Sequence, residues 1–192
     1  MVSRIRHGLQ RLSRLFARDA RGAAAVEFAL ITPLMLTLFF GTVELATGVS
    51  MDRKVTLVSR ALSDLVAQAT SVSDTDMTNV FNASSAIMTP YAMAPMTTKV
   101  SQVKIDGSGK ATIDWSNSWT LGSGMSTGYA VGTDVTSSIP AGLIVNNTYL
   151  IWSEVTYVYT PIVGYVVKSQ ISLSDKFFAR PRQSASVCRT GC

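Results

Sequence analysis

Residues 22–43 read GAAAVEFALITPLMLTLFFGTV, and Glu27 is the only charged residue among them. As a helix, the 21 residues from Ala23 to Val43 would extend about 31 Å at about 1.5 Å per residue, which matches a hydrocarbon core about 30 Å thick. A stretch this long and this apolar predicts a helix that crosses a membrane once. The other parts of the chain must then lie on one side of the membrane or the other.

The residues before this segment are strongly basic. Residues 1–21 contain six arginines and one acidic residue, Asp19, so their net charge of +5 equals the formal net charge of the whole chain. Because cytoplasmic flanks of membrane helices are enriched in Lys and Arg, we expect this leader in the cytoplasm and the chain after about residue 45 in the periplasm of a bacterium. The rest of the chain is neutral overall, so the pI near 9.4 does not indicate a nucleic-acid partner. The arginines are Arg4, Arg6, Arg11, Arg14, Arg18 and Arg21.

A cleaved secretory signal peptide is the alternative interpretation of a basic start followed by an apolar segment. Signal peptides have an apolar core of roughly 7 to 15 residues, followed by a small-x-small cleavage site. The apolar run of residues 23–43 is longer, and no such site follows it convincingly. A retained membrane anchor is therefore favoured.

Helical periodicity continues beyond the predicted span. Apolar residues recur at a spacing of about 3.6, with charged residues between them, so the membrane helix is expected to continue as an amphipathic helix. Pro33 and Gly41 are candidate positions for a bend, although both residue types are common in membrane helices. The apolar residues of the amphipathic part are Val49, Val55, Leu62, Leu65, Val66 and Ala69.

A second, shorter helix is predicted after the first. Ser73 or Asp74 can cap its N-terminus, and Pro90 would end it. Residues at three- and four-residue spacings form its inward face. They are Met77, Val80, Phe81, Ser84, Ile87 and Met88.

The second half of the chain has the pattern of β-strands. Residues 106–109 read DGSG and lie between two alternating apolar runs, which is typical of a hairpin. Residues 149–159 and 170–178 are rich in β-branched and aromatic side chains and are expected to form two further strands. Pro161 and Gly164 are expected in the turn between them.

Residues 116–142 are rich in Gly, Ser and Thr and poor in charge, which predicts a surface loop or an irregular excursion. The elements together predict an α+β fold, with a long N-terminal transmembrane helix that continues as an amphipathic helix, a short second helix and an antiparallel β-sheet. Burial of the amphipathic part of the first helix against the sheet would form the core.

The junction between the basic leader and the apolar segment is Arg21-Gly22-Ala23-Ala24-Ala25-Val26-Glu27-Phe28. It resembles the TadE group of Flp, or tight-adherence, pilus assembly proteins. In Flp-type prepilins a Gly is followed by four residues and then by Glu-Tyr or Glu-Phe, and Gly22 to Phe28 fits this pattern without a gap. The resemblance implies cleavage between Gly22 and Ala23 by a membrane-embedded aspartic prepilin peptidase, with Glu27 and Phe28 as recognition and assembly residues.

Weaker similarity to the same family continues in order along the chain. Major Flp pilins are much shorter, so the resemblance is to minor-pilin or pseudopilin members with an added C-terminal domain. The similar stretches are MTNVFNASSAIMTPY at 77–91, WSNSW at 115–119, LIWSEVTYVYTPIVG at 150–164 and FFARPR at 177–182.

Glu27 carries the main physical constraint of the junction. An ionised carboxylate inside an apolar segment costs a few kcal/mol unless it is paired or lies near the interface. After cleavage the Ala23 ammonium would lie one turn away, and a carboxylate in the first turn would also suit the positive end of the helix dipole. The alternative is that Gly22 is only a spacer and that Glu27 of an uncleaved anchor reaches the headgroups.

The resemblance implies a minor pilin or pseudopilin that is needed for biogenesis of Flp/Tad type IV pili. The implied partners are the prepilin peptidase, other minor pilins, the major Flp pilin, the inner-membrane assembly machinery and the inner membrane itself. The expected units are a basic cytoplasmic leader at 1–22, a transmembrane helix at 23–45, a periplasmic pilin-like domain at 46–182 and a flexible tail at 183–192.

No catalytic constellation is expected. The only histidine, His7, lies in the leader, which excludes the common Ser-His-Asp and Cys-His systems from the exported domain. Cys188 and Cys192 are the only thiols, and in an oxidising compartment they predict a local disulfide or a bond to a partner subunit. Two thiols without histidine do not indicate a metal site, and no cofactor is expected.

Two other hypotheses remain beside the pilin-like subunit. One is an uncleaved single-pass envelope protein whose periplasmic domain binds a partner or the cell wall. The other is an envelope enzyme with an unfamiliar active site, whereas the pilin-like interpretation predicts that the chain is not an enzyme.

Overall fold

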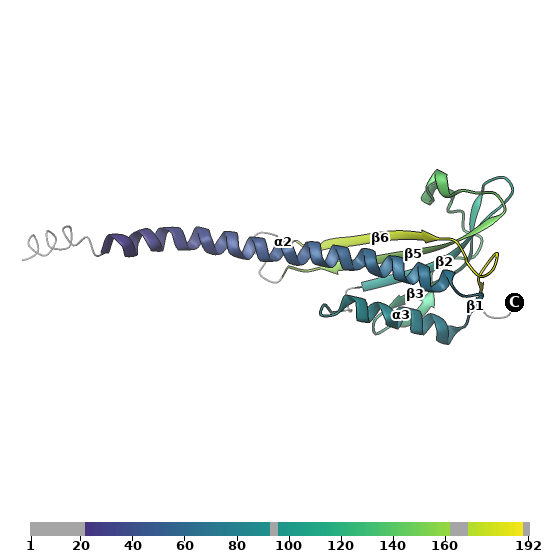
Figure 1. Ribbon diagram of the computed structural model, residues 1–192, viewed down its shortest axis with the longest axis horizontal. Helices are drawn as coiled ribbons and strands as arrows, with labels where there is room; N and C mark the ends of the chain where they lie inside the picture. Colours follow the sequence, from purple (N-terminus) through teal and green to yellow (C-terminus); the bar gives the residue numbers. More distant parts are fainter. Residues whose placement is uncertain (1–21, 93–95, 162–168, 190–192) are drawn as a thin grey trace, which may run out of the picture.

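A single helix organises the whole molecule. The computed structural model describes residues 22–92, 96–161 and 169–189. Helix α2, Ala23–Ala67, is 45 residues long, and its N-terminal half projects from the domain as a rod while its C-terminal half lies along the sheet (Figure 1). This confirms the prediction that the apolar helix continues without a break as the amphipathic one.

The threonine hydroxyls of the rod form hydrogen bonds within the helix itself. Four threonines at five-residue intervals each donate a side-chain hydrogen bond to the backbone carbonyl four residues earlier, at 2.6 to 2.8 Å. Such internal bonds leave no hydroxyl that requires a partner in an apolar medium. Pro33 lies inside α2 without ending it. The threonines are Thr32, Thr37, Thr42 and Thr47.

The folded domain is built on a five-stranded antiparallel sheet with the order β4-β3-β2-β5-β6. The predicted hairpin joins β2 to β3, and the Asp106 carboxylate accepts the backbone N–H groups of Ser108 and Lys110 at 2.8 and 2.9 Å. These two bonds close the turn, in which Gly109 has a φ of +85°. The strands are β2 Met96–Ile105, β3 Ala111–Thr120, β4 Gly124–Thr127, β5 Thr148–Tyr159 and β6 Ile171–Ala179.

The core forms where α2 lies on β5 and β6. A buried stripe of α2 contacts the face of β5 that carries Ile151 and Val155. The prediction was correct for Val55, Leu62 and Val66, which are buried, and wrong for Val49 and Leu65, which are 46% and 43% exposed. The stripe consists of Met51, Val55, Val58, Leu62 and Val66.

A seam of small polar residues lets the helix approach the sheet closely. The Ser63 hydroxyl donates to the Ser153 hydroxyl of β5 at 2.7 Å, and Ser153 donates to the backbone carbonyl of Ser59 at 2.5 Å. All three residues are buried. Because each buried hydroxyl has a partner, the seam fixes the position of α2 along β5 without leaving polar groups unsatisfied.

The second helix, α3 Asp74–Met88, has Ser73, one of the two predicted caps, as its N-cap, and Ser73 forms a capping box with Asp76. The Ser73 hydroxyl accepts the Asp76 backbone N–H at 3.2 Å, and the Asp76 carboxylate accepts the Ser73 N–H at 2.9 Å. These hydrogen bonds from Ser73 lower the pKa of Asp76. At the other end, the Lys54 ammonium of α2 donates to the carbonyls of Ile87 and Thr89 at 2.7 and 2.8 Å. A cation at a helix C-terminus complements the dipole, so α2 and α3 are held together there.

The prediction of a loop over residues 116–142 was wrong in its first part. Residues 116–120 belong to β3, and β4 pairs with that extension. The remaining stretch, which includes the short 3-10 helices η2 Thr136–Ser138 and η3 Ala141–Leu143, covers the sheet face opposite α2. Its buried residues Val135 and Ile139 form a second core with one end of the sheet. The sheet residues in that core are Val103, Ile105, Ala111, Ile113, Leu150 and Trp152.

Two short strands close the fold at the far end of α2. Strand β1, Ser71–Val72, follows α2 directly and pairs in parallel with β7, Cys188–Arg189. The C-terminal segment is thereby attached beside the start of α3 (Figure 1).

The packing of α2 on the sheet predicts a contrast between two leucines of the same helix. Leu62 is 1% exposed and Leu57 is 54% exposed. Leu62→Ala should lower the free energy of unfolding by about 2 to 5 kcal/mol, because it leaves a cavity against β5. Leu57→Ala should change it by less than about 0.5 kcal/mol. Urea unfolding of the full chain in detergent, followed by tryptophan fluorescence, measures both, and equal losses would contradict the assigned stripe.

Candidate assembly site on the N-terminal helix

The predicted processing junction coincides with the start of α2. Gly22 is the N-cap residue, with φ −80° and ψ −19°, and Ala23 is the first helical residue. Gly22 and the following residues are exposed. Residues 1–21, which form the basic leader, lie outside the described residues. The bond between Gly22 and Ala23 therefore joins the N-cap residue to the first residue of α2.

Glu27 stands on the open surface of the rod. Its side chain is exposed, and it has no hydrogen-bond or ion-pair partner among the residues that the structure describes. Since α2 begins at Ala23, Glu27 opens the second turn, and no acidic residue lies in the first. The expectation of a first-turn carboxylate was wrong by one residue, which reduces its interaction with the helix dipole because that interaction fades after the first turn.

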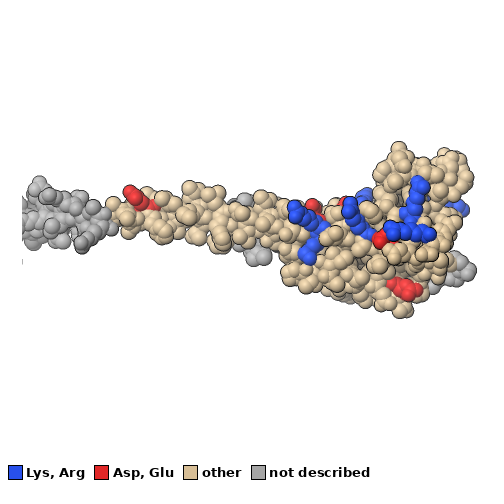
Figure 2. All heavy atoms as spheres, viewed as in Figure 1, with Lys and Arg blue, Asp and Glu red and all other residues tan. Residues whose placement is uncertain are grey.

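The rod exposes an unusually large apolar surface. Its residues from Val26 to Val49 include thirteen large hydrophobic side chains that are between 39% and 74% exposed, and Phe28 is exposed by 69%. No Lys, Arg, Asp or Glu is visible on the middle of the rod in the face that Figure 2 shows. Among the described residues, α2 alone is long and apolar enough to cross a membrane. One N-terminal helix of this kind suggests a single-pass membrane anchor.

One face of the rod has a shallow apolar groove. It runs along the helix from Phe28 to Phe40, past Pro33. Thr32 and Ala29 provide small side chains between the large ones, which lets a second helix approach closely. This is the surface to which Phe28, the predicted recognition residue, contributes.

Glu44 is a residue whose position the sequence analysis missed. It is only 6% exposed, although its neighbours on α2 are open to solvent. Burial raises the pKa of the Tyr159 phenol in β5, and the nearby charge of Glu44 adds to that rise. The sequence signal was available, since Glu44 is the first charged residue after the apolar run, but its burial depends on strands far away in the chain.

The C-terminal segment is docked over residues 183–189, which differs from the predicted flexible tail. Val187 is fully buried, its backbone N–H donates to the Gln102 side chain at 2.6 Å, and its carbonyl accepts the Trp115 indole N–H at 2.9 Å. Cys188 follows in β7. Cys192 lies outside the described residues, so the disulfide between the two stays a prediction.

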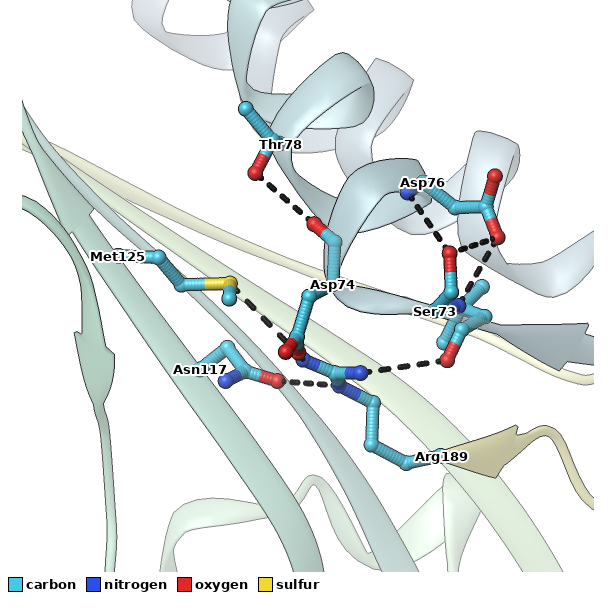
Figure 3. A network of polar contacts seen from close by, with 8 residues as sticks. Ser73, Asp74, Asp76, Thr78, Asn117, Met125 and Arg189 are labelled. Atoms are coloured by element: carbon cyan, nitrogen blue, oxygen red, sulfur yellow. Dashed lines mark hydrogen bonds and ion pairs between the residues drawn. The ribbon is translucent and has the colours of Figure 1, made fainter. Parts of the chain in front are cut away.

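Arg189 fixes this segment to three other elements (Figure 3). Its guanidinium donates to the Asn117 side chain of β3 at 2.8 Å and to the Val72 carbonyl of β1 at 3.3 Å, and it pairs with Asp74 at the start of α3. The Arg189 side chain is 10% exposed. No local pattern predicts this role, because all three partners are distant in sequence.

Two arginines of the C-terminal segment should therefore differ in their effect on stability. Arg189→Met removes several charge-assisted hydrogen bonds from a nearly buried position and should cost on the order of 2 kcal/mol. Arg182→Met removes an ion pair with Asp64 in which the arginine is 60% exposed, and it should cost at most about 1 kcal/mol. Urea unfolding of the two variants beside the unsubstituted chain tests this order, and the reverse order would contradict the network.

Comparison with known proteins gives one family. No curated protein and no solved structure matches the chain. Residues 22–62 match the model of the family described as TadE-like protein, a segment that begins at Gly22 and includes Glu27 and most of α2. Over this segment the chain is similar to TadE-like proteins, as the junction motif predicted, and the likeness associates it with Tad pilus assembly.

Proposed function

We propose that this chain is a minor pilin or pseudopilin that takes part in building Flp/Tad pili as a structural subunit and not as an enzyme. The observation that carries the proposal is the design of α2. Its N-terminal half is exposed and apolar and starts at Ala23, directly after Gly22, while its C-terminal half buries one stripe against the folded domain. A helix of this form can be held by lipid before assembly and by the helices of neighbouring subunits after it.

The proposed orientation follows from charge. The leader of residues 1–21 holds the excess of arginine over acid, which favours its retention in the cytoplasm. The domain that follows the anchor, from residue 46 onward, would then lie in the periplasm. Incorporation of the subunit into the extracellular fibre would carry this domain outward on the end of α2.

Processing between Gly22 and Ala23 would change the charge at the end of the rod. It removes the arginines and creates an ammonium on Ala23, one helical turn before Glu27. The exposed position of Glu27 lets its carboxylate meet an ammonium of the same chain or of a neighbouring subunit. The proposed partners are accordingly the prepilin peptidase, other minor pilins, the major Flp pilin and the inner-membrane assembly machinery.

The first test concerns processing. In cells that contain the prepilin peptidase, the mature chain should begin at Ala23, and Gly22→Val should retain the leader. A Cβ at Gly22 would meet no atom within 4 Å, so this variant should fold normally. Mass spectrometry and N-terminal sequencing of the membrane-extracted protein give the result. Retention of residues 1–22 in the unsubstituted chain would instead favour the uncleaved envelope protein.

The second test concerns assembly. Glu27→Ala should still be processed but should lose most of its copurification with other pilus subunits, because the carboxylate at the start of the rod is gone. Asp52→Ala removes an exposed acidic residue of the same helix and is the matched control. Quantitative mass spectrometry of the complexes measures both. Equal recovery of partners with the two variants would refute the assembly role of Glu27.

A further inference from the structure

A second apolar groove lies where the rod meets the domain. It is formed by α2 and by the ends of β5 and β6 that point toward the N-terminal half of the helix. Leu45 and Val49 line it from the helix, and Tyr159, Ile171 and Leu173 line it from the sheet. This groove follows α2 from Thr37 to Asp52, so it crosses the end of the span of residues 23–45 that the sequence predicts. The acidic residues Glu44 and Asp52 are among the residues that line it.

Several apolar side chains that line this groove are exposed. Leu45 is 70% exposed, Val49 is 46% exposed and Ile171 is 38% exposed. Isolated exposed apolar residues are common on soluble proteins, but these three are continuous with the apolar surface of the rod. The surface that suits lipid therefore does not end at Val43.

The charge of Glu44 does not interrupt this surface. Glu44 lines the groove but is only 6% exposed, and its charge acts on Tyr159, which is itself 4% exposed, so the carboxylate presents little surface to lipid. After Glu27, the next charged side chains that are open to the surroundings are Asp52 and Arg53. The first exposed charges thus lie a full two turns beyond Glu44.

The length of the apolar part of α2 favours a membrane boundary near Met51 over one at Val43. The uncharged stretch from Phe28 to Val43 is 16 residues, or about 24 Å as a helix, which is shorter than a hydrocarbon core of about 30 Å. The stretch from Phe28 to Met51 is 24 residues, or about 36 Å, which crosses that core and reaches the interface. If lipid contact ended at Val43, the stretch from Phe28 to Val43 would be too short to cross the hydrocarbon core. Glu27 would then have to lie inside the core.

We propose that the exported domain rests on the bilayer, with Leu45, Val49 and Ile171 in the boundary between acyl chains and headgroups and with Glu44 shielded from lipid by Tyr159. The partner of this surface is the membrane lipid itself. The inference depends on the proposed anchoring, because it sets the depth at which the anchored chain sits. A second copy of the helix in the same groove is the competing occupant.

Depth measurement on the full chain tests the proposal. Single cysteines at Leu38, Val49, Leu57 and Ile171, all exposed in the structure, would carry nitroxide labels in vesicles of phosphatidylethanolamine and phosphatidylglycerol. The unsubstituted chain, labelled without reductant, gives the background from Cys188 and Cys192. Collision of each label with molecular oxygen, which concentrates in lipid, is compared with collision with a water-soluble nickel chelate.

The expected ratio of oxygen to nickel collisions is severalfold higher at Val49 and Ile171 than at Leu57, and highest at Leu38. Aqueous values at Val49 and Ile171 with a lipid value at Leu38 would overturn the inference and leave the anchor intact. An aqueous value at Leu38 would overturn the anchor as well. Low collision with both agents, with spin–spin broadening that grows with the protein-to-lipid ratio, would assign the groove to a second copy.

The depth of the label at Ile171 also tests whether Tyr159 shields Glu44 from lipid. Tyr159→Ala uncovers the carboxylate and should move the label toward water, while adding Glu44→Gln should move it back because the charge is gone. This rescue separates the charge effect from the packing that Tyr159→Ala also removes. A label depth that does not respond to Tyr159→Ala, or that Glu44→Gln fails to restore, would overturn the shielding role.

Discussion

The structure depends on one unbroken helix, α2, whose N-terminal half suits an apolar medium and whose C-terminal half packs on the folded domain. Each half of α2 makes the same internal hydrogen bonds, so the helix needs no partner for its backbone in an apolar medium. The halves differ only in what covers their side chains. The C-terminal half buries a narrow stripe around Val55 and Leu62 against β5, whereas the N-terminal half leaves its whole circumference open. Rigid continuity between them transmits any force on the rod directly to the folded domain.

The parts of this architecture that arise from local interactions could be predicted from the sequence. The span at residues 23–43 follows from composition and length, the capping box at Ser73 and Asp76 from spacing, and the β2–β3 hairpin from the turn residues at 106–109. Each of these patterns lies within a few neighbouring residues or one continuous segment. Pairing of β2 with β3 follows from the short turn between them, which favours pairing of strands that are neighbours in the chain, whereas pairing of β2 with β5 joins distant segments.

What the sequence could not provide are the contacts between distant segments. Leu65 fits the helical period but is exposed, because the angle at which α2 lies on the sheet selects a stripe one residue away. Residues 128–147 look like a loop, yet Val135 and Ile139 close a second core on the sheet. The anchoring role of Arg189 requires three partners from different elements. Burial of Glu44 likewise arises only once β5 returns to the helix.

The position of the exposed charges links the anchor to its proposed release. In the proposed orientation, the leader arginines would hold one end of α2 at the cytoplasmic surface, and the exposed charges at Asp52 and Arg53 would mark the other end. The proposed removal of the leader would leave only the Ala23 ammonium and Glu27 at the first end, where these two charges could neutralise each other. Transfer of the rod from lipid into a fibre then exchanges one apolar surrounding for another, since hydrophobic burial changes little when helices replace acyl chains. The cost that opposes transfer is concentrated in the charged ends, which is why the leader junction is the physical point of control.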